Sequence, residues 1–287
     1  MEAPKAGTLR ESKADLNLES ALSRSREVLN AIDVAGLPAK PCLASDALQM
    51  EEASDLLQPG PGKMEHGYTR MPDGKLFIAV LTPLENITGE MFDWWFRYVD
   101  NTEKYKLWHP RDHVEGYWSE PHGAKPLEDR LPGHVVGCRH IVKEYLGKEL
   151  QELEIEFKDP SEYLDSSKFE EAGVTACVVA RVSAKDGVAG MVKVGHMLHM
   201  VRRTEGGGSE LRSRFWLGDI HKETGGFPPR WLVNFVGNTR AGRRVKGPLS
   251  VARNLLRHCY EEMTCLDALL PEIWWAHHPQ QAGGGKA

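Results

Sequence analysis

The chain has 287 residues, of which 41% are hydrophobic and 27% charged, as is typical of a globular protein. Its 36 Lys and Arg against 41 Asp and Glu give a formal net charge of −5, which excludes a long-range attraction to nucleic acid or to an anionic membrane. A local basic run at 240–246 is interpreted as a solvated loop.

The amino terminus mixes charged residues where a secretory signal needs an apolar core, and no stretch reaches the roughly 18 apolar residues of a membrane span. The 5 cysteines include no CxxC pair, so neither a disulfide framework nor a thiolate zinc site is indicated. We therefore expect a soluble, cytoplasmic protein with reduced, mostly buried cysteines that contacts neither nucleic acid nor membrane.

The first segment, 1–62, is poor in aromatic residues and ends in a Pro/Gly-rich break. Helical patterns of apolar residues lie around 16–32 and 44–57. We expect this segment to be an extension outside the core, partly disordered and partly a helical arm for contacts between subunits.

A strand is predicted next, over 75–84, because this run is rich in β-branched and aromatic residues. Thr88 then provides a helix N-cap ahead of apolar residues at helical spacing. The pattern predicts a helix from there to about Asn101.

Two further strands are predicted between 135 and 157, on either side of Gly147. In the second of them, Glu152, Glu154 and Glu156 alternate with apolar residues. These three glutamates are expected to face water.

The rest of the chain predicts an antiparallel meander followed by one long helix. Strands are expected at 174–183, 193–203 and 211–217, and a glycine-rich turn joins the last two. The final helical pattern covers about 248–270 and leads into an apolar tail.

This order of elements is that of an α+β helix-grip fold (Bet v 1/START-like), in which an antiparallel sheet curls around a carboxy-terminal helix and encloses a cavity. We assign the helix-grip domain to 63–280 and expect a flexible tail at 281–287.

The sharpest local signal is the pair His258 and Glu262 on the last helix. Residues four positions apart project from the same helix face, as metal ligation requires. Both lie on the apolar stripe of this helix, where a buried charge needs a partner or a metal ion. An ordinary surface pair at the edge of the stripe is the alternative.

Two more candidate ligands precede this helix. The segment WHPRDH contains His109 and His113 in an expected loop, and either one is a plausible metal ligand. In a later strand, Glu144 shares one face with His140 and Val142, and that face points either inward or to solvent.

Together these features resemble the diacetylphloroglucinol hydrolase family, which includes phloretin hydrolase. The resemblance covers about 65–280 and rests on DWWFRYVDNTEKYKLWHPRDH, a strand glutamate and a terminal H-x-x-x-E. It implies a zinc-dependent enzyme on a helix-grip scaffold. Carried onto this sequence, the implied ligands of one zinc ion are His113, Glu144, His258 and Glu262, with His109 as the rival to His113. Iron and manganese also suit such ligands.

The resemblance further implies residues that contact the substrate. Tyr105 matches a tyrosine that contacts a phenolic hydroxyl. Independently of the resemblance, Trp108 belongs to a group of aromatic residues near the loop that is interpreted as the wall of an aromatic pocket, with an ordinary core position as the alternative. A central-strand histidine, His199 or else His196, is expected to act in catalysis, with His199 preferred.

Two positions depart from the expected pattern. Gly116 and Phe215 stand where polar substrate contacts are expected. The loss of these contacts favours a substrate whose aromatic ring carries different substituents.

The implied activity is hydrolysis of the carbon–carbon bond between an acyl group and a polyhydroxylated aromatic ring, in a small phenolic ketone. The resemblance also suggests a homodimer. A carrier of apolar ligands on the same scaffold, a cyclase-like enzyme for polyketide-like substrates and a purely structural interaction protein are the alternatives.

Overall fold

A computed structural model describes residues 18–119, 125–131, 133 and 135–279. Its described residues form one antiparallel sheet of 8 strands in the order β1-β2-β8-β7-β6-β5-β4-β3. The strands are β1 (Gly67–Arg70), β2 (Leu76–Leu84), β3 (His113–Trp118), β4 (Arg139–Leu146), β5 (Glu149–Lys158), β6 (Val174–Asp186), β7 (Gly190–Arg203) and β8 (Ser209–His221).

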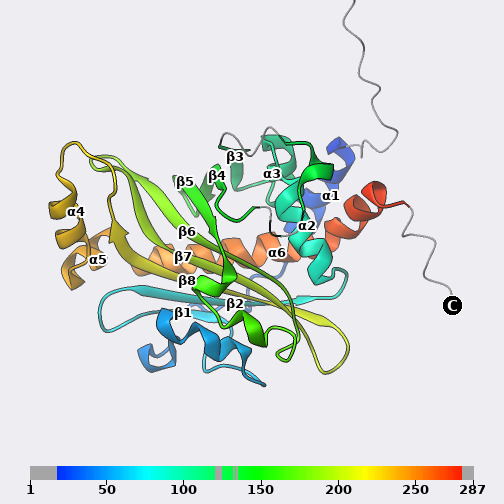
Figure 1. The fold of residues 1–287 in the computed structure, drawn as a ribbon, viewed down its shortest axis with the longest axis horizontal. Coiled ribbons are helices and arrows are strands. Elements are labelled where there is room, and N and C mark those ends of the chain that lie inside the picture. Colours follow the sequence, from blue (N-terminus) through cyan, green and yellow to red (C-terminus); the bar gives the residue numbers. More distant parts are fainter. Residues whose placement is uncertain (1–17, 120–124, 132, 134, 280–287) are drawn as a thin grey trace, which may run out of the picture.

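The long helix α6 (Leu249–His277) crosses the concave face of this sheet (Figure 1). The predicted α+β helix-grip architecture is therefore confirmed. The helix continues past its predicted end at residue 270, because Ile273 and Trp274 of the apolar tail are also buried against the core.

Two helices, α2 (Gly89–Tyr98) and α3 (Thr102–Trp108), cover one end of the sheet. Thr88 caps the first as predicted, since its hydroxyl accepts a hydrogen bond from a backbone amide three residues later, at 3.3 Å. Asn101 does not end that helix but caps the second one in the same way, at 3.0 Å. The expected loop therefore begins only at His109.

The segment before the sheet packs closely onto the domain. Helix α1 (Leu18–Ala31) lies against α3 and α6, and the buried Ser25 hydroxyl donates to the carbonyl of Leu107 at 2.6 Å. A 3₁₀ helix at Met50–Leu57 covers the outer face of the sheet, where it packs near the buried Trp216. The expectation that this segment lies outside the core is corrected for its described part. The expected disorder before residue 18 and the tail at 281–287 lie outside the described residues.

Two short helices, α4 (Arg230–Gly237) and α5 (Arg240–Lys246), connect β8 to α6. The basic run is thus helical and not the predicted loop. Thr239 caps α5 by accepting a hydrogen bond from the amide of Gly242 at 3.0 Å.

The outer face of β5 carries the three predicted water-facing glutamates. Each is partly exposed and ion-paired: Glu152 with Lys185 at 2.9 Å, Glu154 with Arg139 at 3.5 Å and Glu156 with Lys158 at 2.7 Å. The prediction for these glutamates is confirmed.

None of the 5 cysteines forms a disulfide bond; two are buried and three are partly buried. Among the described helices, none is long and apolar enough to cross a membrane.

Candidate active site

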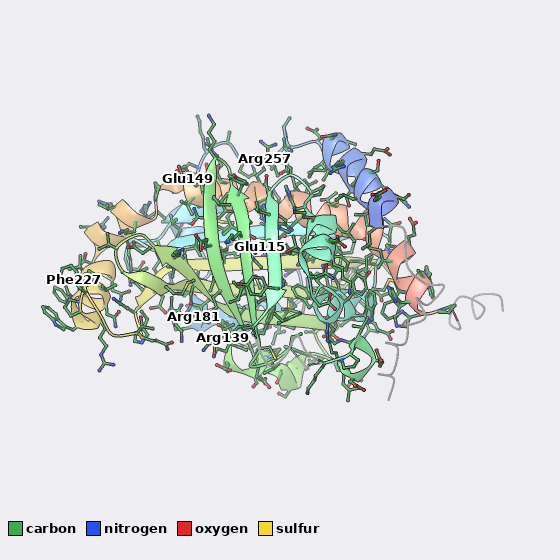
Figure 2. All side chains as sticks on the ribbon, turned by 90° about the horizontal axis from the view of Figure 1, so that it is seen from above. Glu115, Arg139, Glu149, Arg181, Phe227 and Arg257 are labelled. Carbon is green, nitrogen blue, oxygen red and sulfur yellow. The ribbon has the colours of Figure 1, made fainter. Side chains whose placement is uncertain are left out.

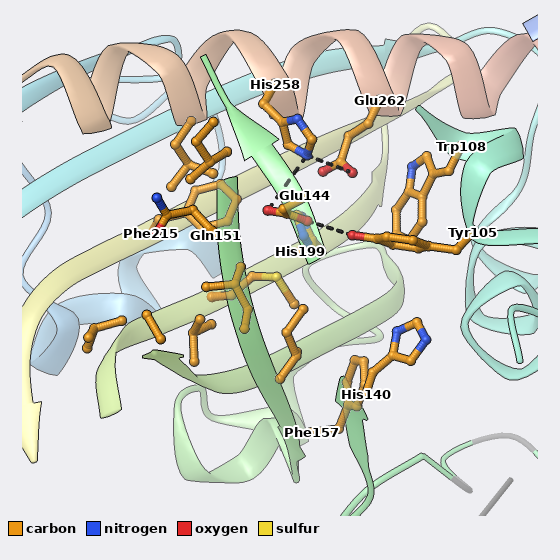
Figure 3. A pocket seen from close by; sticks show the side chains of 18 of the residues that line it. Tyr105, Trp108, His140, Glu144, Gln151, Phe157, His199, Phe215, His258 and Glu262 are labelled. Carbon is orange, nitrogen blue, oxygen red and sulfur yellow. Dashed lines mark hydrogen bonds and ion pairs between the residues drawn. The ribbon is translucent and has the colours of Figure 1, made fainter. Parts of the chain in front are cut away.

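A cavity of about 160 Å³ lies between the concave face of the sheet, α3 and α6 (Figure 3). Its walls are mostly apolar, with Phe96, Phe157 and Phe215 among them. Its polar lining residues are Tyr105, His140, Glu144, Gln151, His199, His258 and Glu262.

The four sequence-predicted metal ligands come together beside this cavity, which three of them, Glu144, His258 and Glu262, line. His113 opens β3 and is paired in register with Glu144 of β4, while His258 and Glu262 lie one turn apart on α6. The Nε2 atom of His113 lies 4.0 Å from Glu144 Oε2 and 3.6 Å from Glu262 Oε2. The Nε2 atom of His258 lies 3.9 Å from Glu144 Oε1 and 3.7 Å from Glu262 Oε2.

These separations suit a single cation. Tetrahedral zinc with bonds of about 2.0–2.1 Å places its ligand atoms roughly 3.3 Å apart. His113, Glu144 and His258 have ligand atoms that all lie within 4.8 Å of one another, and Glu262 lies within 3.7 Å of both imidazoles. A contraction of a few tenths of an ångström would bring Glu144 and Glu262 to bonding geometry with an ion held between the two imidazoles.

Hydrogen bonds orient both imidazoles toward this point. The Nδ1 atom of His113 donates to the carbonyl of Tyr105 at 2.8 Å, which leaves the Nε2 lone pair free, and this buried Nε2 has no hydrogen-bond partner among the described residues. The Nδ1 atom of His258 lies 3.1 Å from Asp112 Oδ2. Acceptors at the outer nitrogen are what ligating histidines usually have, so the residues present fit a metal ion.

The rival His109 points elsewhere. Its Nδ1 accepts a hydrogen bond from the amide of Asp112 at 3.1 Å, and its Nε2 faces Glu261 at 3.4 Å. Its ring stacks on that of His258 at 4.7 Å between centroids. His109, Asp112 and His258 form a second group of potential ligands, but the structure brings His113, and not His109, to Glu144 and Glu262.

The side chains of the cluster shift one another's pKa values strongly. Burial lowers the pKa of His258, but Glu144, Asp112 and Glu262 outweigh this effect and raise that pKa to about 9. Burial and the neighbouring His258 hold the pKa of His113 well below its ordinary value. Burial also raises the pKa of Glu262. Carboxylates thus surround a positive charge, which is the electrostatic environment that a metal cation requires.

Tyr105 is part of the same cluster. Its hydroxyl donates to Glu144 Oε2 at 2.5 Å, and its ring stacks flat on His113 at 3.8 Å between centroids. Burial and the adjacent Glu144 raise its pKa well above 10, so the hydroxyl stays protonated. Gly116 lies behind this ring and not at the cavity wall.

The two central-strand histidines occupy opposite faces of β7. His199 faces the cavity, its Nδ1 is 2.7 Å from the hydroxyl of Ser213, and burial lowers its pKa to about 3. His196 lies on the outer face, where Tyr163 and Asp219 bind it at 2.8 and 3.2 Å. Only His199 is therefore positioned to meet a molecule in the cavity.

The comparison with protein families identifies the chain. The model of the DAPG hydrolase PhiG domain matches residues 48–275, which is most of the chain. This chain belongs to the DAPG hydrolase family. The match begins inside the segment that was expected to be an extension, in agreement with the packing of that segment onto the sheet.

Two relatives illustrate the likeness within the DAPG hydrolase family. A 2,4-diacetylphloroglucinol hydrolase from Pseudomonas sp. is 30% identical over 185 residues, which are 62% of this chain and 60% of the relative. A phloretin hydrolase from Eubacterium ramulus is 29% identical over 216 residues, which are 72% of this chain and 70% of the relative. The match thus spans less than two thirds of the first relative's length.

Among solved structures, the crystal structure of Ara h 8.0201 is 10% identical, with 67% of this chain and 99% of that chain covered and a TM-score of 0.29. The fold assignment rests on strand order and helix placement and not on this weak likeness.

In this DAPG hydrolase family member, sequence reasoning missed two supporting residues. Asp112 lies within the WHPRDH segment, and a carboxylate beside a candidate ligand histidine is a common supporting group that could have marked it. Ser213 pairs in register with His199 across β7 and β8. That pairing could have been counted back from the glycine-rich turn that joins the two strands.

Proposed function

We propose that this chain is a metal-dependent hydrolase that cleaves the carbon–carbon bond between an acyl group and a polyhydroxylated aromatic ring. The observation that carries the proposal is the convergence of two imidazole nitrogens and two carboxylates at the wall of an apolar cavity. Two relatives, a 2,4-diacetylphloroglucinol hydrolase and a phloretin hydrolase, support the same class of substrate.

We assign one zinc ion to His113, Glu144, His258 and Glu262. Two nitrogen and two oxygen ligands suit zinc, although iron and manganese accept the same set. When bound, zinc supplies Lewis acidity to an acyl carbonyl oxygen and to water.

The cavity holds the aromatic ring. Phe215 and Trp108 contribute flat apolar surface, and Tyr105 adds a polar contact at the same end. A phenolic hydroxyl has one proton to donate and lone pairs to accept with. Tyr105 therefore donates to Glu144 and accepts a hydrogen bond from a ring hydroxyl at the same time, which orients the ring.

The reaction needs a proton on the ring carbon before the bond breaks, because direct expulsion of an aryl carbanion is prohibitively unfavourable. Moving a proton from a ring hydroxyl to the acyl-bearing carbon gives a ring ketone. Water then adds its hydroxyl to the acyl carbon, the carbon–carbon bond breaks, and its electron pair returns to the ring as an enolate that is reprotonated to the phenol. The products are a phenol and a carboxylic acid.

We assign the ring proton transfer to His199. Burial keeps its imidazole neutral, so it has one nitrogen that accepts a proton and one that donates. Ser213 holds the Nδ1 side, which leaves Nε2 as the atom that exchanges the proton with the ring.

The test is cleavage of acylphloroglucinols by the zinc-loaded protein and by a His258→Ala plus Glu262→Ala variant. The proposal predicts release of the phenol and the carboxylic acid by the wild type, and none by the double variant. Arg253→Ala plus Glu272→Ala changes two exposed residues on the same helix and serves as the matched control. A metal-free protein that binds the ketones without cleaving them would instead establish a carrier.

The expected homodimer stays a prediction. Light scattering would give about twice the chain mass of 32.1 kDa if it is correct.

A further inference from the structure

The connection between β8 and α6 forms a projecting end of the molecule. Helices α4 and α5 lie at this end in Figure 1, and Figure 2 shows Phe227 at its tip. Neither helix contains a buried residue. This end therefore adds little to the hydrophobic core.

Helix α4 is turned the opposite way from an ordinary surface helix. The side chains of Asn234 and Asn238 face the protein, where each accepts a hydrogen bond from a backbone amide at the end of β8, at 2.7 and 3.0 Å. Trp231 and Phe235, one turn apart on another face, are 67% and 72% exposed. A surface helix normally buries its apolar stripe and exposes its polar one.

Five exposed apolar residues lie within ten positions of the chain at this end, and we call them the end patch. They are Phe227, Trp231, Leu232, Phe235 and Val236, the last four on neighbouring positions of α4. Clustered exposed aromatic residues usually mark a site of interaction. The end patch therefore needs a partner.

Basic residues flank the end patch. Residues 224–250 contain no Asp or Glu and five Lys or Arg, of which Arg243 and Lys246 are ion-paired with Asp73 and Asp186. Arg230, Arg240 and Arg244 are exposed and have no ion-pair partner among the described residues. Three unpaired positive charges therefore flank the end patch, although the whole chain is acidic.

Apolar aromatic side chains flanked by arginines are complementary to a bilayer with anionic headgroups. A second copy of the chain fits less well, because a two-fold contact through the end patch would bring both sets of cations together. We propose that α4 and α5 dock this protein on an anionic lipid bilayer. Trp231 and Phe235 enter the interface between headgroups and acyl chains, and the arginines contact phosphate groups.

This inference reverses the expectation of no membrane contact, which rested on the net charge of the whole chain. The docking elements also connect two walls of the cavity, since Leu217 of β8 and Val251 of α6 both line it. If the proposed function holds, the docked enzyme has its cavity beside the phase into which apolar phenolic ketones partition.

The test is flotation of the full chain with vesicles of phosphatidylcholine, with and without roughly one third phosphatidylglycerol. The proposal predicts binding to the anionic vesicles at low salt, loss of binding as salt is raised, and little binding to the neutral ones. Trp231→Ser plus Phe235→Ser, and separately Arg240→Gln plus Arg244→Gln, should each weaken binding about tenfold or more. Circular dichroism verifies folding, and no substrate is present, so the result is independent of the hydrolase proposal.

Leu43→Ser and Arg26→Gln are the matched controls, because both residues are exposed and lie outside α4 and α5. They should bind like the wild type. The proposal would be overturned if the wild type did not bind anionic vesicles. It would also be overturned if both double variants bound these vesicles as well as the wild type does. So would a dimer in solution that the Trp231→Ser plus Phe235→Ser variant abolishes, because a second copy would then cover the patch.

Discussion

The carboxylate of Asp112 lies 3.1 Å from Nδ1 of His258, on the side of the imidazole ring away from Glu144 and Glu262. This contact holds the histidine with its Nε2 toward the proposed ion. Asp112 is thus a positioning residue that does not itself belong to the four proposed ligands.

Replacing Asp112 with Ala should weaken zinc binding about 10- to 100-fold, because His258 loses the acceptor that orients its ring. The zinc dissociation constant, measured by competition with a chromophoric chelator, checks this. Asp165→Ala is the control, since Asp165 is exposed and lies on the outer side of the sheet near the 3₁₀ helix. Equal affinities for both variants would remove Asp112 from the site.

Gly116→Ala should destabilise the fold by about 1–3 kcal/mol through overpacking. A Cβ atom at this position would lie 2.7 Å from Cγ of Tyr105, whose ring is held between Gly116 and His113. Urea unfolding measures the loss. At Gly225 an added Cβ meets nothing within 4 Å, so Gly225→Ala should leave the free energy of unfolding nearly unchanged. A Gly116→Ala variant as stable as that control would show that the Tyr105 ring is not held tightly.

Ser213→Ala should lower kcat more than it raises KM. The hydroxyl holds Nδ1 of His199 at 2.7 Å, and a mobile imidazole transfers a proton less efficiently. Ser213→Thr keeps a hydroxyl and should retain more of the activity. Steady-state kinetics with zinc content measured on the same samples separates this effect from loss of metal. If Ser213→Ala and the wild type share the same kcat, His199 does not depend on this contact.

Acid stability should depend on Asp219, on the outer face of the sheet. A hydrogen bond with His196 and the positive charge of the nearby Arg181 lower the pKa of Asp219 to about 2, from the ordinary 3.8. A carboxyl whose pKa is lower in the folded state stabilises the fold above its unfolded pKa. That stabilisation disappears as the pH falls from about 4 toward 2. Asp219→Asn should therefore flatten the fall of the unfolding free energy in this window. An unchanged slope would contradict the prediction.

The sequence patterns predicted the elements that carry the site, because each has a clear periodicity. Strand alternation places His140, Val142 and Glu144 on one face of β4, and the structure shows that this face is the buried one. His258 and Glu262 lie on the buried face of α6, as helical spacing placed them.

Other features could not be read from periodicity. Asn101 caps the start of α3, where the sequence pattern predicted only the end of a helix. An asparagine side chain is common both at helix starts and in the turns that separate helices, so its presence alone does not distinguish the two. Helix α4 hides its asparagines and exposes Trp231, which hydrophobicity alone predicts the wrong way round. The choice between His109 and His113 depends on how the chain turns after α3, which only the folded structure shows.

The most direct test of the central claim is the zinc content of two matched histidine variants, counted by elemental mass spectrometry after removal of loosely bound metal. His113 and His109 lie four residues apart and are both buried, but only His113 faces Glu144 and Glu262. We predict one zinc ion per chain in the wild type and in His109→Ala, and none in His113→Ala. Zinc retained by His113→Ala and lost by His109→Ala would contradict the proposed site.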